Sequence, residues 1–131
     1  MLECKDLVKM ARHWSSELEE AMKQELGKGM CEACRMIISI LSLLWAYFPG
    51  SEAEGLTKEA ESMFKEALKL LDLMLDRETD IENIEYLKLY RQNIKMRLDT
   101  LGVLPKESCE VYSSEEFNDD ERWISEQSPL P

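Results

Sequence analysis

The stretch Met36-Ile-Ile-Ser-Ile-Leu-Ser-Leu-Leu-Trp-Ala-Tyr-Phe48 decides the fold of this chain, because no other segment of this length lacks charged residues. As a helix, the stretch would rise only about 20 Å, whereas a membrane span needs about 20 apolar residues. We therefore expect a core helix. Because the stretch is apolar on nearly every side, the other helices should pack around it.

The composition indicates one soluble helical domain. The chain has 131 residues, of which 44% are hydrophobic and 33% charged, with only 5 Gly and 4 Pro. Its formal charge is −11, and residues 105–131 carry eight acidic residues against Lys106 and Arg122. Nucleic acid and anionic membranes are poor partners for so acidic a chain. We expect a protein partner and no membrane insertion.

Helical periodicity of apolar residues predicts four helices. The first covers 3–26 and stops at Gly27 and Gly29, and the second runs from Lys28 or Met30 to Phe48. After a loop over 49–56, Thr57 begins a third helix that ends near Asp76 or Arg77. The expected core positions of the first and third helices are Leu7, Met10, Ala11, Trp14, Leu18, Ala21, Met22, Ala60, Met63, Phe64, Ala67, Leu68, Leu71, Met74 and Leu75.

The fourth helix is predicted over 81–101. Thr79 and Asp80 supply its N-cap, and Gly102 followed by Pro105 is a typical stop signal. The chain is thus predicted to be an all-α antiparallel four-helix bundle over 1–104. Residues 105–131 form an acidic tail or linear motif, in which composition favours disorder but leaves a short helix open.

The fourth helix carries two faces of apolar character. Ile84, Leu87, Ile94, Leu98 and Leu101 form the expected core stripe. A second arc contains Tyr86, Leu89, Tyr90, Asn93, Met96 and Arg97. This second arc either packs against the first helix or the tail, or it binds a segment of a partner protein.

Cysteine and histidine spacing gives weak evidence for a metal or redox site. Cys31 and Cys34 have metal-like spacing, but zinc needs two more ligands, and His13, Cys4 and Cys109 are not paired at typical spacings. We favour buried thiols and expect no metal or other cofactor. The N-terminus has no secretory signal pattern, so we expect free thiols and a cytoplasmic location.

Motifs for common enzyme chemistry do not occur in this chain. It has no glycine-rich phosphate loop, no Gly-x-Ser-x-Gly elbow and no kinase signature. We therefore expect a protein without enzymatic activity.

The tail contains apolar residues that a purely solubilising segment would lack. Phe117, Trp123 and Ile124 could anchor to another protein or fold back on the helices. Ser113 precedes acidic residues and Ser128 precedes a proline, so both resemble short phosphorylation motifs. An unmodified linker remains the alternative reading.

Residues 57–101 resemble the last two helices of a known family. Ala60-Glu-Ser-Met-Phe-Lys-Glu-Ala-Leu-Lys-Leu-Leu71, Asp80-Ile-Glu-Asn83 and Tyr90-Arg-Gln-Asn-Ile-Lys-Met-Arg-Leu98 are similar to microtubule-interacting-and-trafficking (MIT) domains. The last two stretches look most like the C-terminal tandem MIT, or early autophagy targeting, module of autophagy-initiating Ser/Thr kinases. The resemblance implies an adaptor for protein transport or autophagy that binds a short helical or extended motif beside its last helix.

Three functional hypotheses follow. The first is an adaptor that binds a partner segment through the second arc of the fourth helix. The second is an obligate subunit of a larger helical complex, which would cover the spare apolar faces permanently. The third is a small metal- or thiol-dependent protein that uses Cys31 and Cys34.

Overall fold

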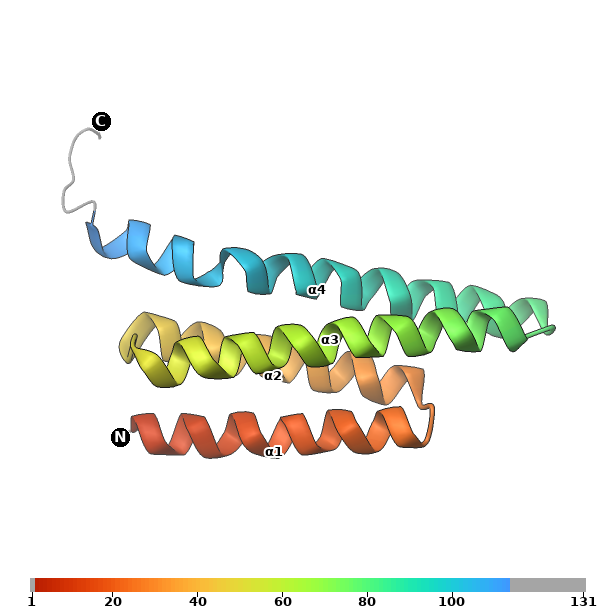
Figure 1. Ribbon diagram of the computed structural model, residues 1–131, viewed down its shortest axis with the longest axis horizontal. Coiled ribbons are helices and arrows are strands. Elements are labelled where there is room, and N and C mark those ends of the chain that lie inside the picture. The colour runs from red at the N-terminus through yellow and green to blue at the C-terminus, as the bar shows by residue number, and fades with distance from the viewer. Residues whose placement is uncertain (1, 114–131) are drawn as a thin grey trace.

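Four α-helices make up the chain in the computed structural model, which describes residues 2–113 and, of these, the side chains of 2–104. They are α1 (Cys4–Lys23), α2 (Gly27–Tyr47), α3 (Ser51–Arg77) and α4 (Ile81–Ser113). Consecutive helices run antiparallel, and the described residues contain no strand (Figure 1). The predicted fold class, an antiparallel four-helix bundle, is confirmed.

The middle of the bundle is formed by α2 and α3. Helix α1 packs mainly on α2, while α4 packs on both α3 and α2. Within the described residues, α1 and α4 do not contact each other, because they lie on opposite sides of the middle pair (Figure 1). The hairpin between α3 and α4 extends beyond the turn between α1 and α2.

Helix α2 is the expected core helix. Its buried residues are Gly27, Met30, Ala33, Cys34, Ile37, Ile38, Ile40, Leu41, Leu44 and Trp45. The expectation that it is enclosed on nearly every side is only partly correct, because Ser39, Leu43 and Tyr47 are exposed. These three residues, called the α2 strip below, stay uncovered because α1 and α4 do not meet over them.

The length of α2 does not by itself separate a core helix from a membrane span. The helix has 21 residues and is long and apolar enough to cross a membrane by length and composition alone. The argument from the shorter apolar stretch is therefore insufficient. Half of its most apolar window is buried inside the bundle, and this packing is what a core helix shows.

The turn between α1 and α2 differs from the predicted one. Helix α1 ends at Lys23, and Glu25 takes the left-handed conformation with φ of 55°. Gly27, the predicted stop, is instead the first residue of α2. A Cβ atom on Gly27 would lie 2.4 Å from Cδ2 of Tyr90, so this glycine allows α4 to approach α2 closely.

Thr57 lies inside a helix and does not cap one. Helix α3 begins at Ser51, so most of the predicted loop over 49–56 is helical. The buried Thr57 hydroxyl donates to the carbonyl of Ala53 at 2.7 Å and accepts from the indole nitrogen of Trp45 at 2.8 Å. Thr57 therefore provides a hydrogen-bond acceptor for the buried indole N–H of Trp45. The local sequence around Thr57 does not reveal this role.

Helix α4 starts as predicted but continues beyond the predicted end. Asp80 caps it, because its Oδ1 accepts from the backbone N–H of Glu82 at 3.1 Å. The helix continues through Gly102 and Pro105 to Ser113, although proline has no N–H to donate within a helix. Helix α4 thus crosses the boundary at 104 and 105 that composition suggested between bundle and tail.

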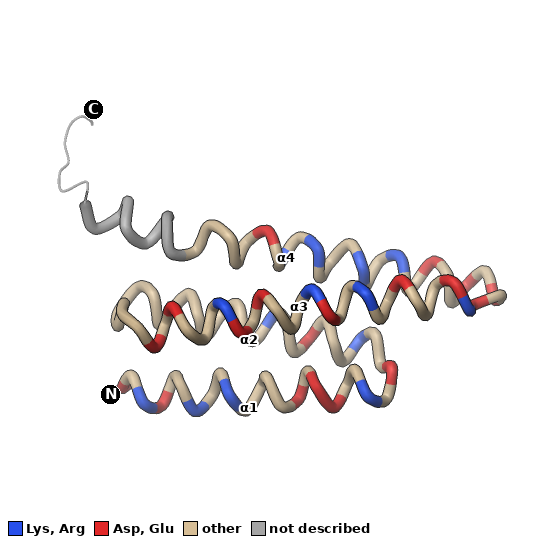
Figure 2. Tube along the Cα trace, viewed as in Figure 1, with Lys and Arg blue, Asp and Glu red and all other residues tan. Residues whose placement is uncertain are grey.

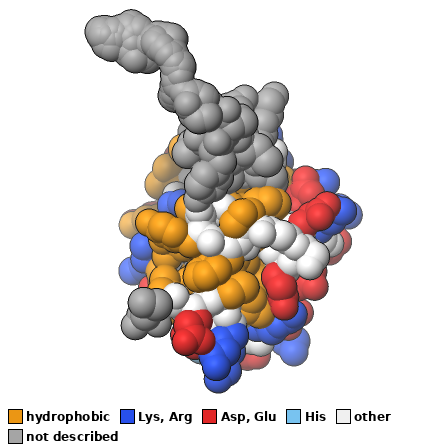
Figure 3. Space-filling view, turned by 90° about the vertical axis from the view of Figure 1, so that its left-hand side faces the viewer, with side chains coloured by type: hydrophobic (Ala, Val, Ile, Leu, Met, Phe, Trp, Pro, Cys, Tyr) orange, Lys and Arg blue, Asp and Glu red, His pale blue; other side chains and the backbone are white. Residues whose placement is uncertain are grey.

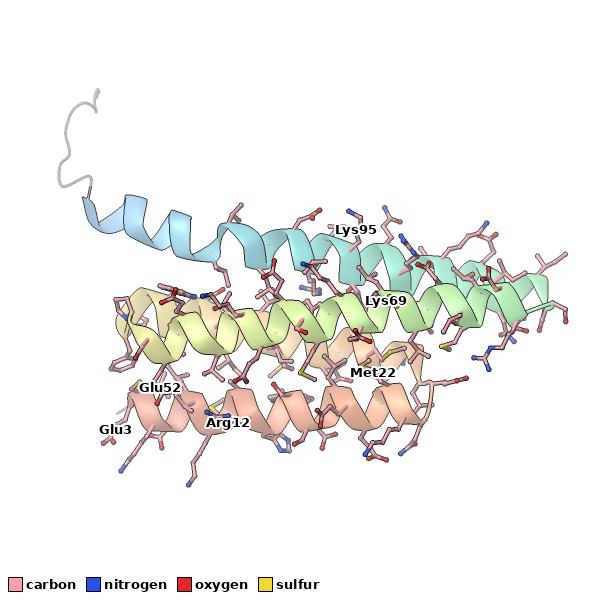
Figure 4. All side chains as sticks on the ribbon, viewed as in Figure 1. Glu3, Arg12, Met22, Glu52, Lys69 and Lys95 are labelled. Carbon is pink, nitrogen blue, oxygen red and sulfur yellow. The ribbon has the colours of Figure 1, made fainter. Side chains whose placement is uncertain are left out.

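The predicted core positions of α1 and α3 are almost all buried or half-buried. Met22 projects from α1 toward the middle of the bundle, whereas Lys95 projects from α4 away from it (Figure 4). Met10 is the exception, because it is exposed and not part of the core.

Two surface ion pairs join different segments of the bundle. Arg91 of α4 pairs with Asp72 of α3 at 2.6 Å, and Arg77 of α3 pairs with Glu25 in the turn between α1 and α2 at 3.0 Å.

Candidate functional site

One face of α4 exposes large apolar side chains. Tyr86 is 50% exposed, Leu89 60%, Met96 61% and Val103 42%. Leu87, Ile94 and Leu101 on the opposite face are buried. The predicted second arc therefore does not pack against α1. The α4 stripe, as we call this face, comprises Tyr86, Leu89, Asn93, Met96, Thr100 and Val103.

The spacing of the α4 stripe is that of a coiled-coil seam. Its residues recur at alternating intervals of three and four, so they fit successive a and d positions of a heptad. Sequence reasoning missed Val103, because Gly102 suggested that the helix had already ended, and it missed Thr100 although this residue lies within the predicted helix. Because α4 continues past Gly102, the alternating intervals of three and four residues assign Thr100 and Val103 to the same face.

Tyr90 is less available to a partner than the sequence suggested. Its ring packs over Gly27 of α2 and is half-buried. The ring also stacks on that of Tyr86, with centroids 6.3 Å apart and planes inclined by 20°. Tyr90 thus belongs to the interface between α2 and α4 and supports Tyr86 from beneath.

Asn93 and Arg97 line an open groove beside the α4 stripe. The Nε of Arg97 donates to Oδ1 of Asn93 at 3.1 Å, and both side chains are half-buried. The opposite wall comes from α2, and the complete lining is Lys28, Cys31, Glu32, Arg35, Asn93 and Arg97. We call this the α2–α4 groove.

The α2–α4 groove is locally cationic in a strongly acidic protein. Three basic residues line it against one acidic residue, Glu32, although the formal charge of the chain is −11. Acidic residues recur along α1, α3 and α4 (Figure 2). Sequence reasoning missed Lys28 and Arg35. Their spacing of seven places them on one face of α2, but it does not show that this face borders Arg97.

Cys31 and Cys34 lie where a thiolate is disfavoured. Burial raises the pKa of Cys31 to about 11, against a smaller opposite effect of Arg97, and burial also raises the pKa of Cys34. The Cys31 thiol donates to the Tyr90 carbonyl, with sulfur and oxygen 3.5 Å apart. Metal ligation needs the thiolate, so burial opposes the metal or thiol hypothesis for this pair.

His13 and Cys4 do not complete a metal site with that pair. His13 is exposed on α1, with its ring edge-on to Trp14 and the ring centroids 5.3 Å apart. Within the residues that the structure describes, no three His, Cys, Asp or Glu side chains gather closely enough to hold a metal ion.

A second exposed apolar area lies at one end of the bundle. Hydrophobic side chains gather near the middle of this end, with charged ones toward its edge (Figure 3). Leu2 and Tyr47 are exposed. The tail candidates Phe117, Trp123, Ile124 and Ser128 lie outside the described residues, as does the side chain of Ser113.

Comparison with known proteins gives no further support for any function. No family model, no curated protein and no solved structure matches the chain. The resemblance to MIT helices therefore stays a prediction based on the residues quoted above.

Proposed function

We propose that this protein is a non-enzymatic interaction module that binds an amphipathic helix of a partner protein along the α4 stripe. The observation that carries the proposal is the exposure of Tyr86, Leu89, Met96 and Val103 on one helix face. Apolar side chains exposed along one line of a helix typically mark a protein-binding surface.

A helical partner fits this surface better than an extended one. Seam residues at heptad spacing interlock with the side chains of a second helix, which presents its own residues at the same intervals. Asn93 lies within the seam, where a polar side chain restricts the register of the bound helix. The neighbouring α2–α4 groove adds positive charge, which favours a partner helix with acidic residues along one edge.

The resemblance to MIT helices adds a cellular context to the proposal. The role that it implies is an adaptor in protein transport or autophagy, and we propose that the module acts in the cytoplasm. The residues that carry this resemblance also include Tyr90, Asn93 and Arg97, which lie on or beside the α4 stripe.

The proposal is tested by two substitutions of matched exposure. Leu89 on α4 and Leu73 on α3 are both 60% exposed, so Leu89→Asp and Leu73→Asp place the same charge at equally accessible positions. We expect both variants to keep the melting temperature of the wild type. Affinity purification from cells, with quantitative mass spectrometry, should then lose specific partners with Leu89→Asp only.

Two outcomes would reject this function. One is equal recovery of every partner with Leu89→Asp and with the wild type. The other is a large loss of melting temperature in Leu89→Asp, which would show that Leu89 belongs to the folding core.

A further inference from the structure

We propose that residues 114–131 fold back along the bundle and dock in the α2–α4 groove of the same molecule. The inference goes beyond the proposed function, because it assigns an occupant to the groove in the protein that has no partner bound to the α4 stripe.

The groove and residues 114–131 carry opposite charges. Lys28, Arg35 and Arg97 line the groove, and among the described residues none of them forms an ion pair with a carboxylate. Residues 114–131 contain six acidic residues and only one basic residue, Arg122. Docking would bring these carboxylates to the three cations, and the tether keeps the local concentration of the segment high.

Residues 114–131 are long enough to return to the groove. The described part of α4 reaches Ser113 and runs parallel to α2, so it carries the chain toward the end of the bundle at which α2 finishes, beyond the groove (Figure 1). Arg97 precedes Ser113 by sixteen residues, which is about 24 Å along a helix. An extended chain from Ser113 to Trp123 spans up to about 33 Å, so it can return to the level of Arg97.

The apolar residues of the segment also find a matching surface. A chain that returns along α2 passes the α2 strip, where Leu43 and Tyr47 are exposed. Phe117, Trp123 and Ile124 can cover these side chains, and an aromatic ring can stack on a guanidinium of the groove. The docked segment would border Asn93, and so would restrict access to one edge of the α4 stripe.

The test uses the full chain with the photo-cross-linker p-benzoylphenylalanine at position 123. We expect intramolecular cross-links to the α2 strip and to the groove residues Arg35 and Arg97, identified by mass spectrometry. Cross-links that map mainly to α1 or α3 would overturn the proposal. So would the absence of cross-links, or cross-links between molecules in a mixture of ¹⁴N- and ¹⁵N-labelled protein.

A matched pair of double variants tests the role of charge. Lys28→Glu with Arg35→Glu reverses two exposed cations of the groove, and Lys58→Glu with Lys69→Glu makes the same charge change on α3. We expect the variant with Lys28→Glu and Arg35→Glu to lose most of the cross-link from position 123. The variant with Lys58→Glu and Lys69→Glu should keep it. Equal yields in the two pairs would contradict docking by charge.

The cross-linking test of the docked segment can fail independently of the partner-binding test of the proposed function. Leu89→Asp should leave the cross-link from position 123 in place, because Leu89 does not line the groove. A loss of partners in Leu89→Asp without any cross-link would therefore support the proposed function and reject the docked tail.

Discussion

Gly27 provides the space in which the ring of Tyr90 packs against α2. The sequence suggested that this glycine ends the first helix, since glycine is common just past a helix end. The positive φ value belongs to Glu25, and Gly27 lies within α2. A side chain at position 27 would collide with Tyr90, so the residue is constrained by contact with another helix.

Gly27→Ala should therefore destabilise the protein, although alanine is the better helix former. Its Cβ would lie 2.4 Å from the ring of Tyr90, and overpacking of this kind costs about 1–3 kcal/mol. Gly55→Ala on α3 is the control, because nothing lies within 4 Å of its added Cβ. The control should gain about 0.5–1 kcal/mol. Urea denaturation of both variants measures the difference, and a stabilised Gly27→Ala would show that Tyr90 moves away freely.

Cys31 should make stability depend on alkaline pH. Its pKa is raised from 9.0 in the unfolded chain to about 11 in the folded protein, so folding favours the protonated thiol. This contribution is complete below pH 9 and is lost as the pH rises through about 11. Between pH 9 and 11 the free energy of unfolding should fall more steeply for the wild type than for Cys31→Ala. Parallel curves would contradict the burial of this thiol.

Helix α4 combines a core face and a free face. Leu87 is 7% exposed and Leu89 60%, although they are separated by a single residue. Leu87→Ala should therefore cost about 2–5 kcal/mol, as expected for a buried leucine. Leu89→Ala should change the free energy of unfolding by no more than about 0.5 kcal/mol. Similar losses in the two variants, measured by urea denaturation, would mean that the second face of α4 is also packed.

The helices and their apolar faces could be predicted because helical periodicity is local. The end of α4 could not, since Gly102 and Pro105 are stop signals that the helix overrides. The local pattern predicts Thr57 as an N-cap, but its hydroxyl accepts a hydrogen bond from the indole N–H of Trp45 on the preceding helix. Neither the end of α4 nor the role of Thr57 follows from neighbouring residues in the sequence, because both depend on the folded structure.

The separation of α1 from α4 across the bundle accounts for two of the candidate surfaces. It leaves the α2 strip uncovered and opens the groove between α2 and α4. Spacing alone predicted the second arc of α4, but it left open whether this arc is packed or exposed. The groove was not, because Lys28 and Arg35 become neighbours of Arg97 only through the packing of α2 on α4.

The proposed function requires that the α4 stripe is free in the isolated protein and covered in its natural setting. Leu89→Cys and Leu73→Cys place thiols at two equally exposed positions, and peptide mass spectrometry separates them from the natural cysteines. The measurement is the rate of maleimide labelling in purified protein and in a cell extract. We predict that the extract strongly slows labelling at position 89 and leaves position 73 unchanged. Equal rates at position 89 in both settings would contradict a helix-binding function for α4.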